Sequence, residues 1–352
     1  MRVITTIPQH NLRDVPSAVN LIEEAGYDGI MTLENRHDPF LPLAVAATTT
    51  ERVELSTGIA ISFLRSPMSA ANITWDLNVA SGGRFVLGLG TQIRAHNEKR
   101  FSVPWSAPAP RMREYVQALR AIWRSWKYGE RLKFEGKHYQ FTLMIPNFVP
   151  EESDLDLPAV TLAAVGPAML KLSGEVADGV RLHPFSTRKY LDDVVVPRIE
   201  MGLQKAGRSR KTFEIGGGGF IATGADDEAV EKAKEWVRYR IAFYGSTPAY
   251  WPVFEAHDEG DLGRKLNHMT KAGQWDQLSG EISDDLLELF AAIGRHDELA
   301  AQIETRFGGV SDSIYASSSS EVRSDLPPDL ITDIQAIGVQ FQKFDTESRG
   351  PA

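Results

Sequence analysis

The sequence predicts a (β/α)8 barrel with insertions and a C-terminal helix. Three observations predict it. The 352-residue chain is 42% hydrophobic and can bury a large core. Short β-branched runs alternate with longer amphipathic segments, and the alternation gives eight strand–helix units. Because such a barrel takes about 250 residues, roughly a hundred belong to insertions, and we expect one domain over residues 1–352.

The strand–helix units follow one another along the chain. The expected strands span 2–7, 28–33, 53–60, 84–89, 159–164, 178–183, 212–223 and 310–316. The expected helices span 14–25, 39–50, 67–80, 110–126, 166–176, 187–206, 226–243 and 295–306. Asp14 and Pro16 suit the start of the first helix, and Gly26 suits its end. Acidic residues 226–228 complement the dipole of the helix that they open.

The pattern lapses in three insertions, near 91–110, 127–157 and 245–284, where Pro, Gly, Trp and His gather. We place the first and third on the strand-to-helix side, where barrels carry their active sites. The second follows the fourth helix. In the tail, 317–352, an amphipathic stretch to about 343 predicts a terminal helix outside the barrel.

Charge and composition exclude several classes of function. The 47 acidic and 38 basic residues leave a net charge of -9. This charge argues against nucleic acid or an anionic membrane as the main partner and favours a small-molecule substrate. The chain has no cysteine, which excludes disulfides, thiolate metal sites and cysteine nucleophiles. We see no histidine spacing typical of a metal site, no signal region and no membrane span, so we expect a cytoplasmic protein.

A glycine-rich strand is the most informative segment. The stretch 81–91 combines a Ser-Gly-Gly turn, a buried strand and glycines at its carboxyl end. Gly88 and Gly90, followed by Thr91, would let a flat ligand approach the backbone. A tight strand-to-loop turn explains them equally well.

Two further strands end in features that suit a ligand. Gly58, beside Ile59 in an apolar strand, marks a bulge or a close backbone approach, unless it only relieves crowding. At the end of the fifth strand, a glycine and a proline begin a helix whose free amides could bind phosphate. An ordinary proline-initiated helix is the alternative. The residues concerned are Ala164, Val165, Gly166 and Pro167.

Basic residues gather where several strands end. Guanidinium groups bind carboxylate and phosphate through paired hydrogen bonds, although most single arginines are simply solvated. The candidates are Arg65, Arg94, His96, Arg100, Arg181 and His183, with Arg188 and Lys189 as weaker members.

Together these segments resemble the luciferase-like monooxygenase superfamily, and within it the branch that uses the deazaflavin coenzyme F-420. The resemblance implies a barrel that binds a flavin or deazaflavin at its carboxyl-end mouth, often as a homodimer. It implies a non-prolyl cis peptide bond at Gly58–Ile59 that supports the cofactor ring, and cations that hold the cofactor's charged tail. The segments that carry it are 25–30, 56–60, 65–67, 81–90, 163–167 and 177–180.

The residues after the second strand depart from that family's pattern. Relatives commonly carry an acid followed by one or two histidines, whereas Asn35 stands here where a catalytic histidine would be expected. His37 could serve as an acid or a hydrogen-bond donor, because an unperturbed imidazole titrates near about pH 6.5. Glu34 could orient a neighbour or accept a proton. Equally, Asp38 and Pro39 fit a cap of the next helix, with His37 taking no part.

The sequence therefore predicts an oxidoreductase that transfers a hydride between F-420 and an unidentified small organic substrate. Two alternatives stay open: an FMN-dependent two-component monooxygenase and a non-catalytic deazaflavin-binding protein. The glycines at 216–219 lie on the expected seventh strand, where they would make room in the mouth. Aromatic residues of the insertions fit either a substrate pocket or a dimer contact: Phe101, Trp105, Phe243, Tyr244, Tyr250 and Trp251.

Overall fold

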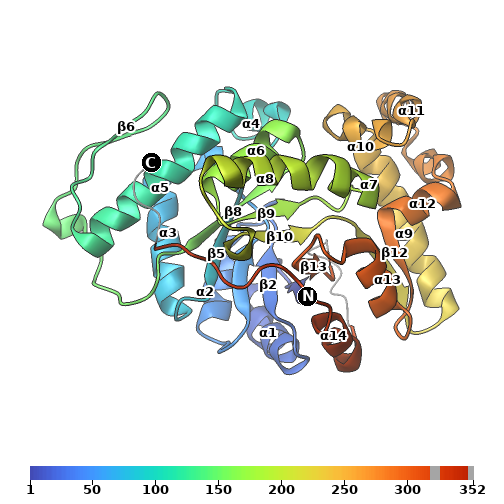
Figure 1. Ribbon diagram of the computed structural model, residues 1–352, viewed down its shortest axis with the longest axis horizontal. Helices are drawn as coiled ribbons and strands as arrows, with labels where there is room; N and C mark the ends of the chain where they lie inside the picture. The colour runs from blue at the N-terminus through green and yellow to red at the C-terminus, as the bar shows by residue number, and fades with distance from the viewer. Residues whose placement is uncertain (318–325, 348–352) are drawn as a thin grey trace.

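Parallel strands close into a barrel in the computed structural model, which describes residues 1–317 and 326–347 (Figure 1). The ring runs β3-β2-β1-β13-β10-β9-β8-β5, and β5 pairs back to β3. The predicted fold class is confirmed. The strands are β1 (Arg2–Thr6), β2 (Gly29–Thr32), β3 (Glu54–Thr57), β4 (Ala60–Ile61), β5 (Phe85–Gly90), β8 (Ala159–Ala164), β9 (Gly179–Leu182), β10 (Glu214–Gly217) and β13 (Ser313–Tyr315).

Helices surround the ring, and local sequence signals explain where they begin and end. Ser66 caps α3 by accepting a hydrogen bond from the Met68 N–H, and Pro67 occupies its first turn. Gly129, with a φ of 66°, ends α5 in the left-handed region. The barrel helices are α1 (Val15–Glu24), α2 (Phe40–Ala47), α3 (Pro67–Ala80), α5 (Pro108–Tyr128), α6 (Pro167–Val176), α8 (Val196–Lys205), α13 (Leu299–Phe307) and α14 (Pro328–Gln335).

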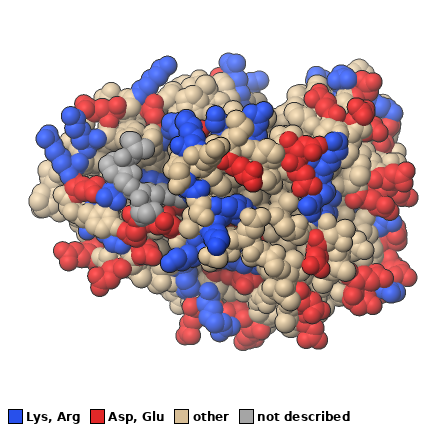
Figure 2. All heavy atoms as spheres, in the orientation of Figure 1, with Lys and Arg blue, Asp and Glu red and all other residues tan. Residues whose placement is uncertain are grey.

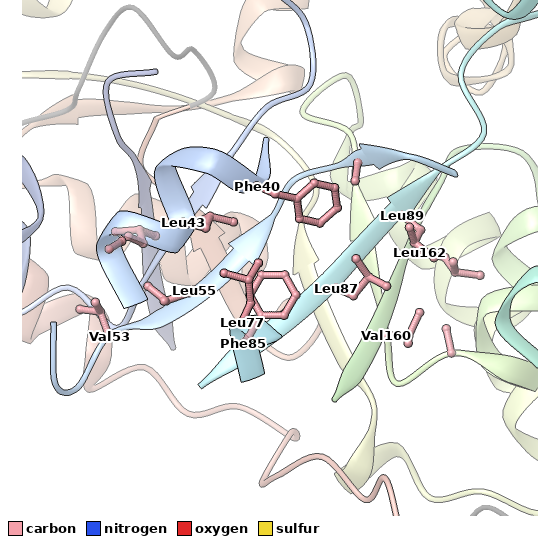
Figure 3. Packing of buried hydrophobic residues seen from close by; sticks show 14 of the residues in the cluster. Phe40, Leu43, Val53, Leu55, Leu77, Phe85, Leu87, Leu89, Val160 and Leu162 are labelled. Carbon is pink, nitrogen blue, oxygen red and sulfur yellow. The ribbon is translucent and has the colours of Figure 1, made fainter. Parts of the chain in front are cut away.

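The main core lies between the outer faces of the strands and these helices. Phe85, Leu87 and Leu89 alternate along β5 and point outward, where they meet side chains of the neighbouring strands and of α2 and α3 (Figure 3). Each of these three side chains is almost fully buried. Burial of one such side chain contributes about 1.5 to 3 kcal/mol, so this shell holds the ring in place.

The predicted strand at 212–223 is wrong in one respect, because the chain breaks it in two. Gly217 and Gly218 adopt φ angles of 80° and 113°, which glycine reaches without strain. Beyond this turn, β11 (Phe220–Gly224) leaves the barrel and pairs in parallel with β12 (Ala291–Arg295), which the sequence analysis did not predict.

The third insertion is consequently larger than the expected 245–284. It includes α9, which we expected to be a barrel helix, and α13 is the barrel helix that precedes β13. Figure 1 shows the insertion standing at one side of the barrel. Its helices are α9 (Asp227–Gly245), α10 (Trp251–Glu255), α11 (Gly260–Lys271) and α12 (Asp284–Phe290).

The first two insertions are smaller. The first carries α4 (Arg94–Lys99), and the second carries an antiparallel hairpin of β6 (Phe134–Glu135) and β7 (Gln140–Phe141). Among the helices of the described ranges, none combines the length and the apolar composition that a bilayer span requires.

The tail packs against the amino ends of the strands. The expected terminal helix is α14, which packs on α13 and β1 and ends earlier than predicted. After it, the Phe341 N–H donates to Asp312, and Lys127 pairs with Glu347 at 2.8 Å. Phe344 lines a cavity of about 320 Å³ at this end. Part of the predicted tail, 318–325 and 348–352, lies outside the described residues.

Candidate active site

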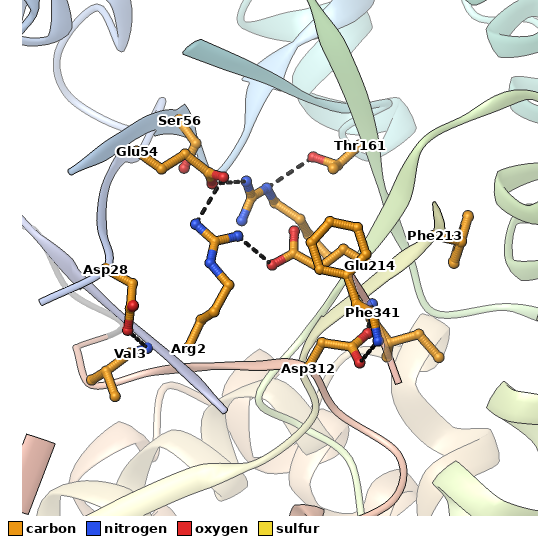
Figure 4. A network of polar contacts seen from close by, with 12 residues as sticks. Arg2, Val3, Asp28, Glu54, Ser56, Thr161, Phe213, Glu214, Asp312 and Phe341 are labelled. Carbon is orange, nitrogen blue, oxygen red and sulfur yellow. Dashed lines mark hydrogen bonds and ion pairs between the residues drawn. The ribbon is translucent and has the colours of Figure 1, made fainter. Parts of the chain in front are cut away.

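A buried ionic network fills the barrel interior near the amino ends of the strands (Figure 4). Arg2 pairs with Glu54 at 2.8 Å and with Glu214 at 3.1 Å. Arg181 donates through Nε to the Thr161 hydroxyl at 2.9 Å and lies 3.9 Å from Glu54. Burial raises the pKa of Glu54, although Arg2 acts to lower it. Our placement of Arg181 among the cations of the mouth is therefore wrong, because its side chain belongs to this interior network.

Tyr315 forms the next layer toward the mouth. Its hydroxyl accepts a hydrogen bond from Arg181 Nη1 at 3.3 Å, and burial raises its pKa. A Cβ atom at Gly216 would lie 2.5 Å from this hydroxyl, and one at Gly217 would lie 2.6 Å from the ring. These glycines do make room, as expected, but a tyrosine ring fills it. Sequence analysis missed Tyr315, although it alternates with the inward-facing Ser313.

The segment that joins β3 to β4 is tightly fixed. Its peptide bond Gly58–Ile59 is cis, as the family resemblance implies. The Gly58 N–H donates to the Thr32 carbonyl at 2.7 Å, and the Glu34 N–H donates to the Ile59 carbonyl at 3.3 Å. A Cβ atom at Gly58 would lie 2.6 Å from Met31 Sδ, so a larger residue here would displace the Met31 side chain. The carboxyl end of β3 therefore presents one defined backbone surface.

Glu34 positions this segment. One of its oxygens accepts a hydrogen bond from the Ile61 N–H at 2.6 Å, and both oxygens accept from Arg65 at 2.8 Å. Arg65 also pairs with Asp38 at 3.2 Å. Burial acts to lower the pKa of Arg65, but the two carboxylates hold it above its ordinary value. Of the two roles considered for Glu34, the orienting one agrees with these contacts.

The loop after β2 contains His37, for which we considered a catalytic role, and Asp38, for which we considered a role as helix cap. Asp38 accepts hydrogen bonds from the N–H groups of Phe40 and Leu41, at 2.8 and 3.2 Å, and so caps α2. His37 is exposed and makes no hydrogen bond with the described part of the chain. The capping alternative is confirmed for Asp38.

The two glycines of β5 serve packing within the barrel. A Cβ atom at Gly88 would lie 1.9 Å from the Thr57 carbonyl oxygen, and one at Gly90 would lie 2.6 Å from Ile59 Cδ1. Packing within the barrel therefore accounts for both glycines, and their expected role of admitting a flat ligand stays a prediction. Thr91 is partly exposed at the exit, and its carbonyl accepts a hydrogen bond from Asn97.

The junction of β8 and α6 is open. Nothing lies within 4 Å of a Cβ atom built on Gly166. Pro167 begins the helix, and the amides of Gly166 and Ala168 have no acceptor among the residues that the structure describes. Ala164 is buried, and Val165 accepts a hydrogen bond from the Tyr190 hydroxyl at 3.2 Å. Free amides at an uncrowded helix start are what an anion requires.

Most of the other expected cations are engaged by residues of the protein. Arg94 pairs with Glu98 on α4 at 3.1 Å, and His96 is exposed on the same helix. Arg100 donates to the Asn35 carbonyl. Arg188 and Lys189 pair with Asp192 and Asp193, one turn further along their helix, at 2.8 and 2.6 Å. Arg94, Arg188 and Lys189 each pair with a carboxylate four residues along the chain, whereas Arg100 reaches the loop after β2.

His183 does lie at the mouth, directly after β9. Its Nδ1 accepts a hydrogen bond from the Phe185 N–H at 3.0 Å. Its ring packs on Tyr244 and Tyr250, with centroids 4.2 and 4.8 Å apart. Burial, aided by the charge of Arg240, lowers the pKa of His183 to about 3. At neutral pH the ring is therefore neutral, and Nε2 carries its proton.

The third insertion supplies the tyrosines and one residue that sequence analysis missed. Arg240 on α9 donates to the Tyr244 hydroxyl at 2.7 Å. Its position four residues before Tyr244 could have indicated this contact, because residues at i and i+4 are neighbours on the surface of a helix. Phe243 packs on Tyr244, and the Trp251 indole donates to the Gly245 carbonyl. Within the described ranges, no group of three or more His, Asp or Glu side chains could hold a metal ion.

Comparisons with known proteins agree with this architecture. The sequence profile of the luciferase-like monooxygenase family matches residues 2–312. An uncharacterized protein of Mycobacterium tuberculosis is 48% identical over 319 residues, covering 90% of this chain and 94% of that protein. The 5,10-methylenetetrahydromethanopterin reductase of Archaeoglobus fulgidus is 27% identical over 348 residues, covering 96% of this chain and 97% of that enzyme.

A solved structure shares the fold. The coenzyme F420 dependent tetrahydromethanopterin reductase from Methanopyrus kandleri matches with a TM-score of 0.77 at 22% identity. The match covers 96% of this chain and 97% of that chain. At this identity the structural similarity supports a common fold and nothing more.

Proposed function

Because the chain belongs to the luciferase-like monooxygenase family, we propose that it is an oxidoreductase that transfers a hydride between coenzyme F-420 and a small organic substrate. The observation that carries the proposal is an arrangement at the barrel mouth. A fixed backbone surface at Gly58–Ile59 and an open helix start at Gly166 lie at the carboxyl ends of strands in one ring. The likeness to the methanopterin reductase of A. fulgidus supports the same chemistry.

The residues present fit a deazaflavin with a phosphate-bearing tail. The unpartnered amides of Gly166 and Ala168 would hold the phosphate, because a helix start favours negative charge. The segment 58–61, tied to β2 through Glu34, would support the ring. The deazaflavin, when bound, supplies the two-electron hydride chemistry.

The chain's own residues then provide position and a dry environment. Tyr315 closes the interior below the mouth, and the rings of Tyr244 and Tyr250 cover one side of His183. His183 is neutral and holds a proton on Nε2, from which it donates a hydrogen bond to a bound substrate. With Asn35 in place of a histidine, this is the donor that we assign to the mouth. Fixed groups of this kind align the reacting atoms at little further entropic cost.

Fluorescence titration with F-420 and with FMN, each oxidised and reduced, tests the proposal. We expect F-420 to bind at least about tenfold more tightly than FMN, a difference of about 1.4 kcal/mol, because only F-420 carries a charged tail beyond the phosphate that both cofactors share. Equal binding, or tighter binding of FMN, favours the two-component monooxygenase alternative. Tight F-420 binding with no hydride transfer to any substrate offered favours a deazaflavin-binding protein.

A further inference from the structure

We infer that the substrate carries a carboxylate, which Arg240 binds beside the His183 hydrogen-bond donor. This inference rests on the proposed function and adds the class of substrate to it. It is built from the cluster of His183, Tyr244, Tyr250 and Arg240 on the β9 side of the mouth.

Arg240 is a cation that pairs with no carboxylate in the part of the chain that the structure describes. Its one hydrogen bond within the described chain runs from Nη2 to the Tyr244 hydroxyl at 2.7 Å, and no carboxylate of that part of the protein lies within ion-pair distance. Its Nε is buried without an acceptor. The guanidinium lies 5.3 Å from the Trp236 ring and 5.0 Å from the Tyr244 ring. These faces and the hydroxyl hold it in one orientation.

Other arginines of the chain show how unusual this arrangement is. Arg238, two residues earlier on α9, pairs with Glu235 and Asp284 at 3.0 and 2.6 Å. Arg208 and Arg306 lack carboxylates too, but each donates to two backbone carbonyls. Arg240 has neither kind of acceptor. A partly buried charge without a partner is costly, so an anion that completes its hydrogen bonds would bind favourably.

The neighbours of Arg240 narrow the ligand further. Tyr244 and Tyr250 offer aromatic faces, and the Nε2–H of His183 offers one neutral donor, because its Nδ1 is already engaged by the Phe185 N–H. A planar unsaturated acid fits this set: its ring would stack on the tyrosines and its carboxylate would receive the free guanidinium N–H groups. A hydrogen-bond acceptor next to the reacting carbon would meet His183.

Calorimetric titration of the F-420-loaded protein with benzoate and with benzamide, its uncharged analogue, tests the inference. We expect benzoate to bind at least about tenfold more tightly than benzamide, because only the acid can pair with Arg240. Arg240→Met keeps much of the side-chain volume and should abolish the preference while leaving F-420 affinity unchanged. Arg238→Met removes an arginine from the same helix and should retain the preference, with thermal unfolding as the check that both variants fold.

Three results would overturn the inference: no binding of benzoate, a preference that survives Arg240→Met, or a preference lost equally in Arg238→Met. Weaker F-420 binding by Arg240→Met would assign the cofactor's own charged tail to this arginine and would overturn it as well. If the parent chain fails to bind F-420, the proposed function fails. Titration of the unloaded chain with the same two probes then still decides whether Arg240 recognises a carboxylate.

Discussion

His183 is the single residue at the mouth whose chemistry the fold alters most. Its ring packs on Tyr244 and Tyr250, near the charge of Arg240, and burial with that charge lowers its pKa to about 3 from an ordinary 6.5. Burial disfavours the charged ring, and among the described residues no carboxylate acts to restore it. The imidazole therefore acts as a neutral donor over the whole range in which an exposed histidine would titrate.

This lowered pKa predicts how stability depends on pH. Below about pH 6.5 the unfolded chain binds the His183 proton while the folded chain does not, so stability should be complete above pH 6.5 and fall toward pH 3. The slope from this one group is at most about 1.4 kcal/mol per pH unit. Urea unfolding at several pH values should show a shallower slope for His183→Gln. Imidazole NMR signals of His183 that titrate near pH 6.5 would contradict the prediction.

Glu34 is expected to matter for stability as well as for the site. Its side chain is 10% exposed, and it joins Arg65 to the Ile61 amide. Glu34→Gln should lower the free energy of unfolding by about 3 kcal/mol, since it leaves a half-buried arginine short of its counter-charge. Chemical denaturation measures the loss.

A matched control for Glu34 lies on the surface. Glu98→Gln breaks the exposed Arg94 pair on α4 and should cost less than about 0.5 kcal/mol. A similar small loss for both variants would mean that Glu34 does not fix the segment 58–61.

Residue patterns predicted backbone features better than side-chain partners. The open start of α6 follows from glycine and proline at a strand end, whereas the cis peptide bond at Gly58–Ile59 was implied by the family resemblance. The partners of the cations were not predicted, because a pairing such as Arg181 with Thr161 depends on which face of a strand meets which neighbour. The packing contacts of Gly88 and Gly90 were not predicted for the same reason: the sequence does not show which protein atoms lie beside a glycine.

At the scale of the elements, the turn after β10 is a feature that strand prediction from the sequence did not find. The run 212–223 reads as one strand because β-branched and apolar residues flank the glycines on both sides. The positive φ angles at Gly217 and Gly218 turn the chain out of the ring, and β11 finds its partner in β12, about seventy residues later in sequence. A pairing between segments so far apart cannot be predicted from the residues next to either strand.

The start of α6 gives the most specific prediction at this scale. Gly166→Val should crowd the approach to the free amides and weaken F-420 by about one to two orders of magnitude, roughly 1.4 to 2.8 kcal/mol. A truncated deazaflavin without the phosphate and glutamate tail should bind almost as before, because it does not reach this helix. Fluorescence titration compares the two ligands. Equal weakening of both would make Gly166 a structural glycine and would place the phosphate elsewhere.

At the scale of the molecule, the eight-stranded ring was predicted because it rests on periodicity repeated along the whole chain, although α9, expected as a barrel helix, belongs to the third insertion. The family resemblance is confirmed for the same reason, since its segments occur in order over most of the barrel. Figure 2 shows acidic side chains along the side that carries the third insertion, in keeping with the net charge of -9. The homodimer implied by the family stays a prediction that sedimentation would check.

The two ends of the barrel differ in what they offer a ligand. The amino end holds a cavity of about 320 Å³ partly covered by the tail, whereas the carboxyl end holds the fixed segment 58–61, the open α6 start and His183. Barrels place their chemistry at the carboxyl end. We claim that F-420 binds there.

Hydrogen exchange of the full chain with and without F-420 tests this claim most directly. We predict that F-420 slows amide exchange in segments 57–61 and 165–170, which carry the proposed ring and phosphate contacts, and leaves the tail at 338–347 unchanged. Protection confined to the tail and the amino ends of the strands, or no protection in either segment of the mouth, would contradict the account.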